Sequence, residues 1–363
     1  MKKIGIITFH MACNYGAVLQ AFALQTKLGQ LFPEDEVEII DYYCPAIEDR
    51  TKIFHFTKTG NCFRDLLRFM FQFRARAVRY ISFNSFRNKH LKLSKDRYNG
   101  ENIKQIQNTY DIIWSGSDQI WNLESTGFDE NYFLAFADQA TSKCAYAASF
   151  GFQSAYENCK NLILNLLSRY DAISVREAIG TQELRDSFGC PPQIHVDPTL
   201  LLKADEWKNI EAKNLKLPDK YLLVYCILEP NQLLTEVRKI SKDTGLPVYY
   251  IGNDIKNKDF KHLPHLSVEE FLTWISHADL VATTSFHGTV FSILNHVNFI
   301  TEFNTQGKYN TRVEHLLDTL ALPGRNVECT AFNPMEPINW NACEEKLLQE
   351  RNRAENYLLN SDK

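Results

Sequence analysis

The chain of 363 residues lacks a long apolar run, a paired-cysteine motif and a strong excess of either charge. No stretch approaches the roughly 20 apolar residues that span a bilayer, so no membrane-spanning helix is expected. The apolar run after Met1 ends at Phe9 and meets His10, so no secretory signal peptide is expected either. The net charge of -4 gives no reason to expect a nucleic-acid partner.

The nine cysteines are odd in number and scattered, and no two of them form a CxxC pair. This pattern argues against a disulfide framework and a structural zinc site, and it fits reduced thiols in the cytoplasm. No cluster of histidine, cysteine and carboxylate residues has the spacing of metal ligands, so no metal is expected.

Length and pattern predict two α/β domains, because a chain this long exceeds what one hydrophobic core usually organises. Buried strands alternate with helices over residues 1–203, which predicts a doubly wound first domain. The charged stretch 203–219 is predicted to be a linker. A new series of strands and helices predicts a smaller second domain over 220–340, and residues 341–363 are predicted to form a terminal helix.

The first predicted strand, Lys3–Thr8, leads through a polar turn into a helix over about 17–31. The turn carries Asn14 and Gly16 where a dinucleotide-binding protein carries the glycines of GxGxxG. A dinucleotide cofactor is therefore not indicated.

A helical insertion is predicted in the first domain over about 53–108. Within 53–93, basic residues alternate with aromatic and aliphatic ones, and Asp65 is the only acid. One interpretation is a surface that meets anionic lipid headgroups or a pyrophosphate-linked acceptor. The other, which we favour, is a helical hairpin that packs its aromatic side chains on the sheet and leaves its arginines in solvent, as ordinary helices do.

The segment Leu280–Ile293 predicts a buried strand, a polar turn and a helix that starts at Gly288. Such a turn lies at the carboxyl edge of a parallel sheet, where open α/β sheets bind ligands, and the helix start favours an anion. Ser285, His287 and Thr289 surround that point, and Gly288 would let a ligand approach the backbone. The alternative is an N-cap serine and a core histidine.

A second turn suited to an anion is the run Ser174 to Glu177, in which Arg176 stands where a strand enters a helix. A guanidinium binds phosphate or carboxylate through two parallel hydrogen bonds and stays charged. The alternative is a surface ion pair with Glu177. If the two domains face each other across a cleft, Arg176 would come from one side and His287 from the other.

Five motifs follow one another along the chain: NYGAVLQ at 14–20, GSDQIWN at 116–122, SVRE at 174–177, DPTLL at 197–201 and SFHGTVFS at 285–292. With these motifs in this order and spacing, the chain resembles the polysaccharide pyruvyltransferases. The resemblance extends from near the start of the chain to about Arg325. The resemblance implies a GT-B-like fold, with two Rossmann-like domains facing a cleft. It also implies transfer of the pyruvate skeleton from phosphoenolpyruvate to a sugar hydroxyl pair as a ketal, with release of phosphate and no further cofactor. One departure is Thr284, because relatives commonly have Asp at this position.

The resemblance implies that the donor is phosphoenolpyruvate, which carries a phosphate and a carboxylate. We expect it to contact Arg176 in one of the two turns suited to an anion and His287 in the other. Neighbouring backbone N–H groups and hydroxyls are expected to assist, and they belong to Ser285, Phe286, Gly288 and Thr289. His287 either donates the proton to the donor's C3 or binds the phosphate as a cation.

The acceptor sugar is expected on the first domain. The residues suited to hold its hydroxyls are Asn14, Tyr15, Gly16, Ser117, Asp118, Gln119 and Asn122. Trp121 would stack on a sugar face, and Asp118 is a candidate base for the attacking hydroxyl. Alternatively, Ser117 and Asp118 cap a helix and Trp121 fills the core. For Gln20 we expect a buried structural hydrogen bond, and for Asp197 a turn-forming role.

The leading interpretation is a cytoplasmic bacterial transferase that modifies a sugar of a capsule or exopolysaccharide, or its lipid-linked precursor at the inner membrane face. There the segment 53–93 would suit peripheral attachment. One alternative is a GT-B-type glycosyltransferase, whose nucleotide-sugar diphosphate would be held by Arg176 and the helix start at Gly288. Another is a saccharide-binding protein without activity. Fold analogy alone does not separate these.

Overall fold

The computed structural model describes residues 1–49, 62–151, 153–179, 181–188, 192–252, 257–305, 308–309, 311–329, 332–334 and 336–361. The chain divides into two compact units. The first consists of Met1–Arg76, Asn84–Leu201 and Glu350–Lys363, and the second of Ala77–Phe83 and Leu202–Gln349.

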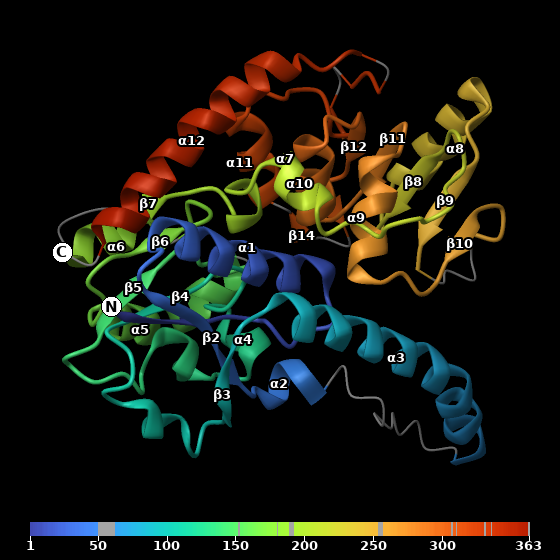
Figure 1. The fold of residues 1–363 in the computed structure, drawn as a ribbon. Coiled ribbons are helices and arrows are strands. Elements are labelled where there is room, and N and C mark those ends of the chain that lie inside the picture. The colour runs from blue at the N-terminus through green and yellow to red at the C-terminus, as the bar shows by residue number, and fades with distance from the viewer. Residues whose placement is uncertain are drawn as a thin grey trace. The chain divides into compact units, whose positions relative to one another are not determined.

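The first unit is built on a parallel sheet with the strand order β3-β2-β1-β4-β5 (Figure 1). Its strands are β1 (Lys3–Ile7), β2 (Glu36–Tyr42), β3 (Leu93–Tyr98), β4 (Ile112–Ser115) and β5 (Ser142–Ala145). A short parallel pair, β6 (Ser174–Val175) with β7 (Gln193–Ile194), continues it, because single bridges join Cys144 to Ala172 and Ala148 to Val175. All of these strands therefore end at one carboxyl edge.

The helices of the first unit are α1 (Tyr15–Leu31), α2 (Pro45–Glu48), α3 (Cys62–His90), α4 (Leu123–Thr126), α5 (Gln153–Leu167) and α6 (Thr181–Phe188), except that Ala77–Phe83 of α3 are grouped with the second unit. Asn14 begins α1 as its N-cap, since its side-chain oxygen accepts a hydrogen bond from Ala17 N at 3.2 Å. A core cluster of this unit combines aliphatic and aromatic side chains from different parts of the chain, including Ile7, Ala17 and Trp121.

The helical insertion differs from the hairpin that we favoured, while its interpretation as a surface for lipid headgroups stays a prediction. Its helical part is one continuous helix of 29 residues, α3, and not a hairpin, while residues 50–61 lie outside the described part of the chain. The predicted range also extends too far, because β3 within it is a strand of the central sheet.

The second unit repeats the plan of the first, with the strand order β10-β9-β8-β11-β12 in a parallel sheet. Its strands are β8 (Leu222–Tyr225), β9 (Val248–Ile251), β10 (Lys261–Leu263), β11 (Leu280–Thr283) and β12 (Phe299–Thr301), followed by the antiparallel pair β13 (Asn304–Thr305) and β14 (Lys308–Tyr309). Both orders, counted along the chain, are 3-2-1-4-5, which is the Rossmann arrangement with its switch point between the first and fourth strands. The prediction of two Rossmann-like domains is confirmed.

The remaining helices are α7 (Ala204–Lys208), α8 (Leu233–Thr244), α9 (Val268–Ser276), α10 (Phe286–Leu294), α11 (Thr311–Thr319) and α12 (Trp340–Asn360). α7 lies in the stretch expected to be a linker, so that stretch is partly helical. The terminal helix begins and ends within one residue of its predicted core, and its part from Glu350 onward belongs to the first unit. No helix in the described ranges is both long enough and apolar enough to cross a membrane.

Candidate functional site

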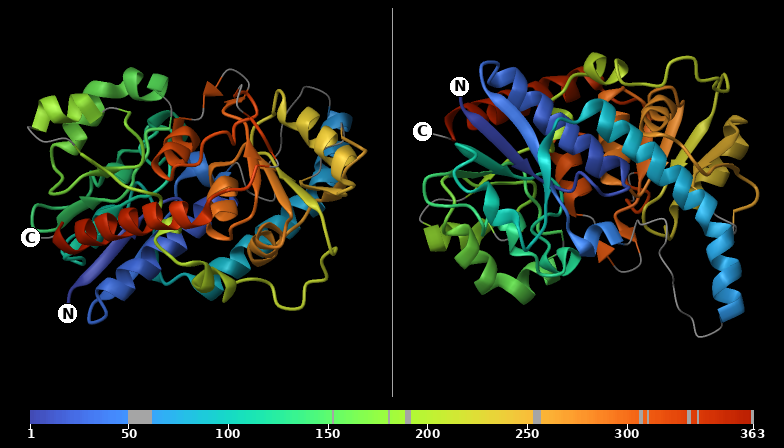
Figure 2. Two further views of the ribbon diagram at one scale, coloured as in Figure 1. Left: turned by 90° about the horizontal axis from the view of Figure 1, so that it is seen from above. Right: turned by 60° about the horizontal axis from the view of Figure 1, so that its bottom comes forward.

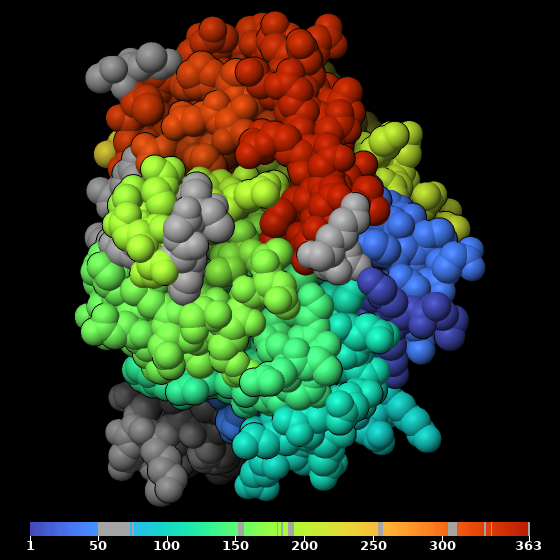
Figure 3. Space-filling model, turned by 90° about the vertical axis from the view of Figure 1, so that its left-hand side faces the viewer, coloured from blue at the N-terminus to red at the C-terminus, as the bar shows by residue number. Residues whose placement is uncertain are grey.

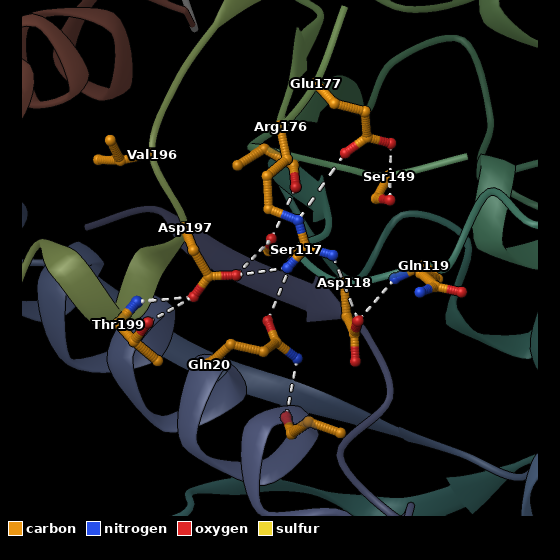
Figure 4. A network of polar contacts seen from close by, with 12 residues as sticks. Gln20, Ser117, Asp118, Gln119, Ser149, Arg176, Glu177, Val196, Asp197 and Thr199 are labelled. Atoms are coloured by element: carbon orange, nitrogen blue, oxygen red, sulfur yellow. Dashed lines mark hydrogen bonds and ion pairs between the residues drawn. The ribbon is translucent and has the colours of Figure 1, made fainter. Parts of the chain in front are cut away.

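The carboxyl edge of the first sheet brings together charged side chains that follow three strands. Asp118 comes after β4, Arg176 after β6 and Asp197 after β7 (Figure 4). The backbone of Ala148 joins two of these turns, since it forms parallel bridges with both Asp118 and Val175. Local strand pairing thus places Asp118 next to Arg176.

Arg176 is surrounded by carboxylates. Its Nη1 donates to Asp197 Oδ2 at 2.6 Å, its Nη2 lies 3.4 Å from Asp118 Oδ1, and its Nε lies 3.9 Å from Glu177 Oε2. Burial opposes the charge of Arg176, but attraction by Asp197, Asp118 and Glu177 outweighs burial and raises its pKa. The guanidinium is therefore a permanent cation whose charge is already matched inside the protein.

This arrangement corrects the interpretation of Arg176 as half of a surface ion pair, while donor binding by Arg176 stays a prediction. The side chain is only 2% exposed, so it does not form a surface pair with Glu177, which is equally buried. Nor is the guanidinium open to a phosphate in this structure, because three carboxylates occupy its surroundings. One positive and three negative groups leave the cluster with an excess of negative charge.

Two members of the cluster have structural roles that the sequence indicated. Asp197 Oδ1 accepts hydrogen bonds from Thr199 N at 3.0 Å and from its hydroxyl at 2.7 Å, which confirms the turn-forming role. Gln20 is fully buried; it donates to Thr8 Oγ1 at 2.8 Å and accepts from Ser117 N at 3.1 Å. The buried structural hydrogen bond expected for Gln20 is likewise confirmed.

Ser117 supports the turn after β4 and does not face solvent. Its side chain is fully buried, and its hydroxyl donates to Ala147 O at 2.6 Å. Neither of the roles expected for it, holding a sugar or capping a helix, matches this position. Its hydroxyl instead fixes the backbone directly before Asp118.

Asp118 is the member of the cluster that solvent reaches, with a side chain 16% exposed against 0–2% for Arg176, Glu177 and Asp197. Its backbone has φ +70°, a left-handed conformation that is uncommon for a residue with a side chain. Such strain persists only where neighbours determine the backbone, as the bonds of Ser117 and Ala148 do here. Asp118 is thus a carboxylate that is both firmly held and accessible.

Trp121 and Asn122 turn away from solvent. The indole of Trp121 is fully buried and stacks on Phe133, with ring centroids 5.4 Å apart and planes at 13°. It therefore fills the core, and stacking on a sugar face is not what this structure shows. Asn122 is the N-cap of α4 and accepts from Ser125 N at 3.1 Å, whereas Gln119 beside it is partly exposed.

The turn after β1 offers one exposed side chain. Asn14 is exposed, and its amide nitrogen takes no part in the cap of α1. Tyr15 and Gly16 are buried in the first turn of that helix. Of the three residues expected to hold an acceptor here, Asn14 is the one in contact with solvent.

A histidine–carboxylate pair at the same edge was missed by the sequence reasoning. His10, after β1, is buried; its Nε2 lies 3.1 Å from Asp41 Oδ1, and Arg97 at the end of β3 links Asp41 with Glu48. Burial raises the pKa of Glu48 in spite of that partner. The three strand ends are distant in sequence, so only the order of the strands, β3-β2-β1, could have indicated the pair.

In the second unit, α10 begins at Phe286 and not at Gly288. Ser285 is its N-cap and accepts from Gly288 N at 3.2 Å, as the alternative interpretation has it. A Cβ on Gly288 would clash with the Thr283 hydroxyl and lie 3.1 Å from Thr283 Cβ. The glycine is therefore required by close packing of α10 on β11, and its expected contact with a ligand stays a prediction.

His287 and Thr289 lie in the first turn of α10. His287 is 8% exposed, and its ring meets that of Phe286 edge to face at 5.2 Å. The hydroxyl of Thr289 donates back to Ser285 O at 3.2 Å. His287 thus stands at the helix start, with a small part of its ring exposed.

The loop from β8 to α8 is fastened beside that helix start by two buried side chains. Thr284 Oγ1 accepts from Ile227 N at 3.2 Å and from Leu228 N at 3.3 Å. The carboxylate of Glu302, after β12, accepts from three successive backbone N–H groups, those of Asn231, Gln232 and Leu233. Thr284 therefore has a structural role, and Glu302 was not anticipated, since nothing in its local sequence indicates a cap for a helix some 70 residues earlier.

Two cavities of the first unit lie away from this chemistry, at the amino ends of β6 and β7. Their volumes are about 490 and 370 Å³, and Gln193 and Arg353 line both. Figure 3 shows this side of the unit, where the red end of α12 lies against the green surface. The carboxyl edge with Asp118 is the opposite edge of the same strands. Among the residues that the structure describes, no group of three or more His, Cys, Asp and Glu side chains could hold a metal ion.

Comparison with known proteins assigns a family. Residues 14–301 match the family model described as polysaccharide pyruvyl transferase. No curated protein matches the chain significantly.

Among solved structures, the chain is similar to UDP-GlcNAc 2-epimerase of Methanocaldococcus jannaschii in complex with UDP-GlcNAc and UDP. The identity is 14% and the TM-score 0.48, with 99% of this chain and 93% of that chain covered. It is also similar to the E. coli heptosyltransferase WaaC with ADP-2-deoxy-2-fluoro heptose, at 12% identity and a TM-score of 0.42, with 96% and 99% covered. Similarity at this level supports no statement about function.

Proposed function

Because the chain belongs to the polysaccharide pyruvyl transferase family, we propose that it transfers pyruvate from phosphoenolpyruvate to two hydroxyls of a sugar as a ketal. The proposal rests on the position of the Asp118 side chain. A base for a sugar hydroxyl must be held in place and yet be reached by the substrate. Asp118 meets both conditions, since Arg176 holds its Oδ1 while its side chain is partly exposed at the carboxyl edge.

The reaction proposed is balanced without an oxidant or a metal. A proton adds to C3 of the donor, and one sugar hydroxyl forms a bond to C2 as its own proton is removed. The C2–O bond to phosphate then breaks, and the second hydroxyl closes the ketal, so that one of the two hydroxyl protons remains on C3 and the other leaves with phosphate. Asp118 accepts the proton of the attacking hydroxyl.

The charge of the first unit's cluster argues for placing the donor on the second unit. Phosphoenolpyruvate is strongly anionic at neutral pH, and the excess negative charge around Arg176 would repel it. The start of α10 instead offers backbone N–H groups, the positive end of a helix and His287. We place the donor there, with contacts from Ser285, Phe286, His287, Gly288 and Thr289.

Arg176 then acts through Asp118. As a guanidinium fixed between Asp197 and Asp118, it sets the position of the base and does not itself bind the donor. The acceptor is a sugar of a surface polysaccharide or of its lipid-linked precursor, held on the first unit by Asn14, Asp118 and Gln119. Assembly of such precursors on the inner membrane face places the protein in the cytoplasm.

Calorimetric titration with phosphoenolpyruvate tests the donor assignment. We expect saturable binding by the wild type, loss of binding in His287→Ala, and retained binding in Arg176→Lys. His277→Ala is the matched control, since His277 is an exposed histidine of the same unit outside the proposed site, and it should bind as the wild type does.

Other outcomes would redirect the proposal. Loss of phosphoenolpyruvate binding in Arg176→Lys would indicate that Arg176 contacts the donor directly. Binding of a nucleotide sugar in place of phosphoenolpyruvate, with nucleotide release on turnover, would identify a glycosyltransferase. Phosphate release from phosphoenolpyruvate in the presence of sugar acceptors would establish the transfer.

A further inference from the structure

Helix α3 concentrates positive charge in a chain that is otherwise acidic. Its 29 residues, Cys62–His90, contain six arginines and one lysine but a single acid, Asp65. The whole chain nevertheless has a net charge of -4. The cationic character is therefore local to this helix and is not a general property of the surface.

The same helix exposes large apolar side chains. Phe73 and Val78 are each 38% exposed and Ile81 is 63% exposed, and Arg74 is exposed among them. At about 100° per residue, these four side chains fall within about half of the helix circumference. We call them the docking face: Phe73, Arg74, Val78 and Ile81.

The later part of α3 is anchored through its other side. Phe83 and Phe86 are fully buried, and Phe22 of α1 meets the rings of Phe86 at 6.2 Å and of His90 at 5.9 Å. In the right-hand view of Figure 2 the helix is continuous, and its N-terminal part extends away from the strands of the first sheet. α3 thus buries one side against the protein and exposes apolar side chains and an arginine on the other. Such an exposed apolar face is a candidate for contact with another surface.

We propose that the docking face rests on an anionic lipid bilayer. Phe73, Val78 and Ile81 would enter the boundary between headgroups and acyl chains, where interfacial helices place their apolar side chains. Arg74, which is exposed on the same face, would remain at the level of the lipid phosphates, which long cationic side chains reach by extending from the apolar face. The helix lies on the membrane and does not cross it, in keeping with its many charges.

Charge complementarity favours this occupant over two others. A second copy of the chain docking through the same face would bring two strongly basic helices together, and like charges oppose such contact. A nucleic acid would suit the arginines but would leave the exposed Phe73, Val78 and Ile81 without an apolar partner. A bilayer with anionic headgroups matches both parts of the face.

Flotation with lipid vesicles tests the proposal. The full-length protein is mixed with vesicles of phosphatidylglycerol and phosphatidylcholine, or of phosphatidylcholine alone, and the bound fraction is measured at low and high salt. We expect binding to the anionic vesicles that weakens with salt, and much weaker binding to the neutral ones. The assay contains neither phosphoenolpyruvate nor a sugar, so its result does not depend on the proposed function.

A matched pair of variants localises the contact. Ile81→Asp with Arg74→Glu changes two exposed positions of the docking face, and we expect the partition onto anionic vesicles to fall at least about tenfold. The control is Phe128→Asp with Lys95→Glu, which makes the same change in charge at an apolar side chain 59% exposed and an exposed lysine elsewhere in the first unit. The control should bind as the wild type does, and equal melting temperatures would show that both variants fold.

Three results would overturn the proposal. They are no binding of the wild type to anionic vesicles, equal binding to neutral and anionic vesicles, and equal behaviour of the docking-face variant and its control.

Discussion

At the scale of single residues, Arg176 shows how far a side chain's role depends on partners that are distant in sequence. Its contacts, Asp197 and Asp118, lie 21 and 58 positions away. The motif around Arg176 indicated a guanidinium at a sheet edge, and it is there. That Asp118 and Asp197 also reach this guanidinium could not be read from the motif, because their meeting depends on the pairing of the strands β4 to β7.

Replacing Arg176 by alanine is expected to destabilise the protein by about 3–5 kcal/mol, because Asp197 and Glu177 would remain buried without their cation. Urea unfolding measures this change. The control is Arg353→Ala, which removes a side chain that is 56% exposed and paired with Glu350, and it should cost less than about 1 kcal/mol. An Arg176→Ala variant no less stable than the control would contradict the description of a buried, mutually dependent cluster.

His195, the buried residue before Val196, predicts a pH dependence of stability. Burial, assisted by the charge of Arg353, lowers its pKa from the usual 6.5 to about 4. Well above pH 6.5 the His195 ring is neutral in both the folded and the unfolded chain, so it adds no pH dependence to the free energy of unfolding. Between about pH 6.5 and 4 the unfolded chain binds a proton that the folded chain does not, so the free energy of unfolding falls as pH falls, by about 2 kcal/mol at pH 5.

The measurement is a pair of urea titrations at pH 7 and pH 5 on the wild type and on His195→Gln. Since glutamine does not titrate, the variant should lose about 2 kcal/mol less stability than the wild type between the two pH values. An identical loss in both proteins would show that His195 takes up its proton in the folded state.

The residues whose roles were correctly predicted are those whose function is local or whose burial follows from the helix pattern. Asp197 before Pro198 carries its turn signal in the sequence, and Gln20 lies on the inward side of a strongly apolar helix. For Trp121 the sequence left two roles open, sugar stacking and core filling, because a motif specifies residue types and not which side of a turn faces the core. Glu302 and His10 were missed because each acts on a segment from another strand.

At the scale of elements, the strands were predicted well where apolar runs are continuous, as in β1 and β11. Helix ends were less accurate where a cap decides them. α10 starts at Phe286 because the Ser285 hydroxyl satisfies a backbone N–H of its first turn, and an apolar pattern alone does not show that. The helical insertion was misjudged at its end, since the short strand β3 is largely polar on its exposed side.

Gly288→Ala is expected to destabilise the second unit by about 1–3 kcal/mol, which is typical of overpacking in a filled interior. The added methyl group would meet Thr283, whose hydroxyl donates to Tyr225 O at 2.6 Å and accepts from Ser285 N at 3.0 Å, so it is not free to move. Thermal unfolding measures the effect.

The control for that substitution is Gly29→Ala in α1, an exposed helical glycine whose added Cβ would meet nothing within 4 Å. It should leave stability unchanged or raise it by up to about 1 kcal/mol, because alanine favours the helix. If both alanines behaved alike, close packing of α10 on β11 would not be the reason for Gly288.

At the scale of the whole molecule, alternation of strands and helices sufficed to predict two α/β units, whereas their Rossmann-like form was implied by the family resemblance; the two strand orders are identical. The units differ in the charge that they present at their carboxyl edges. The first gathers Asp118, Glu177 and Asp197 around one arginine, whereas the second presents a helix start with no acid in its first turn. The second edge also holds the carboxylate of Glu302, but that group is occupied by the backbone N–H groups of Asn231, Gln232 and Leu233. On this contrast we base the proposal that the first unit holds a neutral sugar and the second an anionic donor.

The division of roles between the two units makes a last prediction. Asp118→Asn keeps the size of the side chain but removes the base, so turnover of phosphoenolpyruvate with a sugar acceptor should fall by about 10²–10⁴ in kcat. The affinity for phosphoenolpyruvate, measured by calorimetry, should not decrease, because the donor is placed on the second unit and removing a negative charge cannot weaken an anion's binding through repulsion. If donor affinity instead fell together with kcat, Asp118 would belong to the donor site, and the assignment of one substrate to each unit would be wrong.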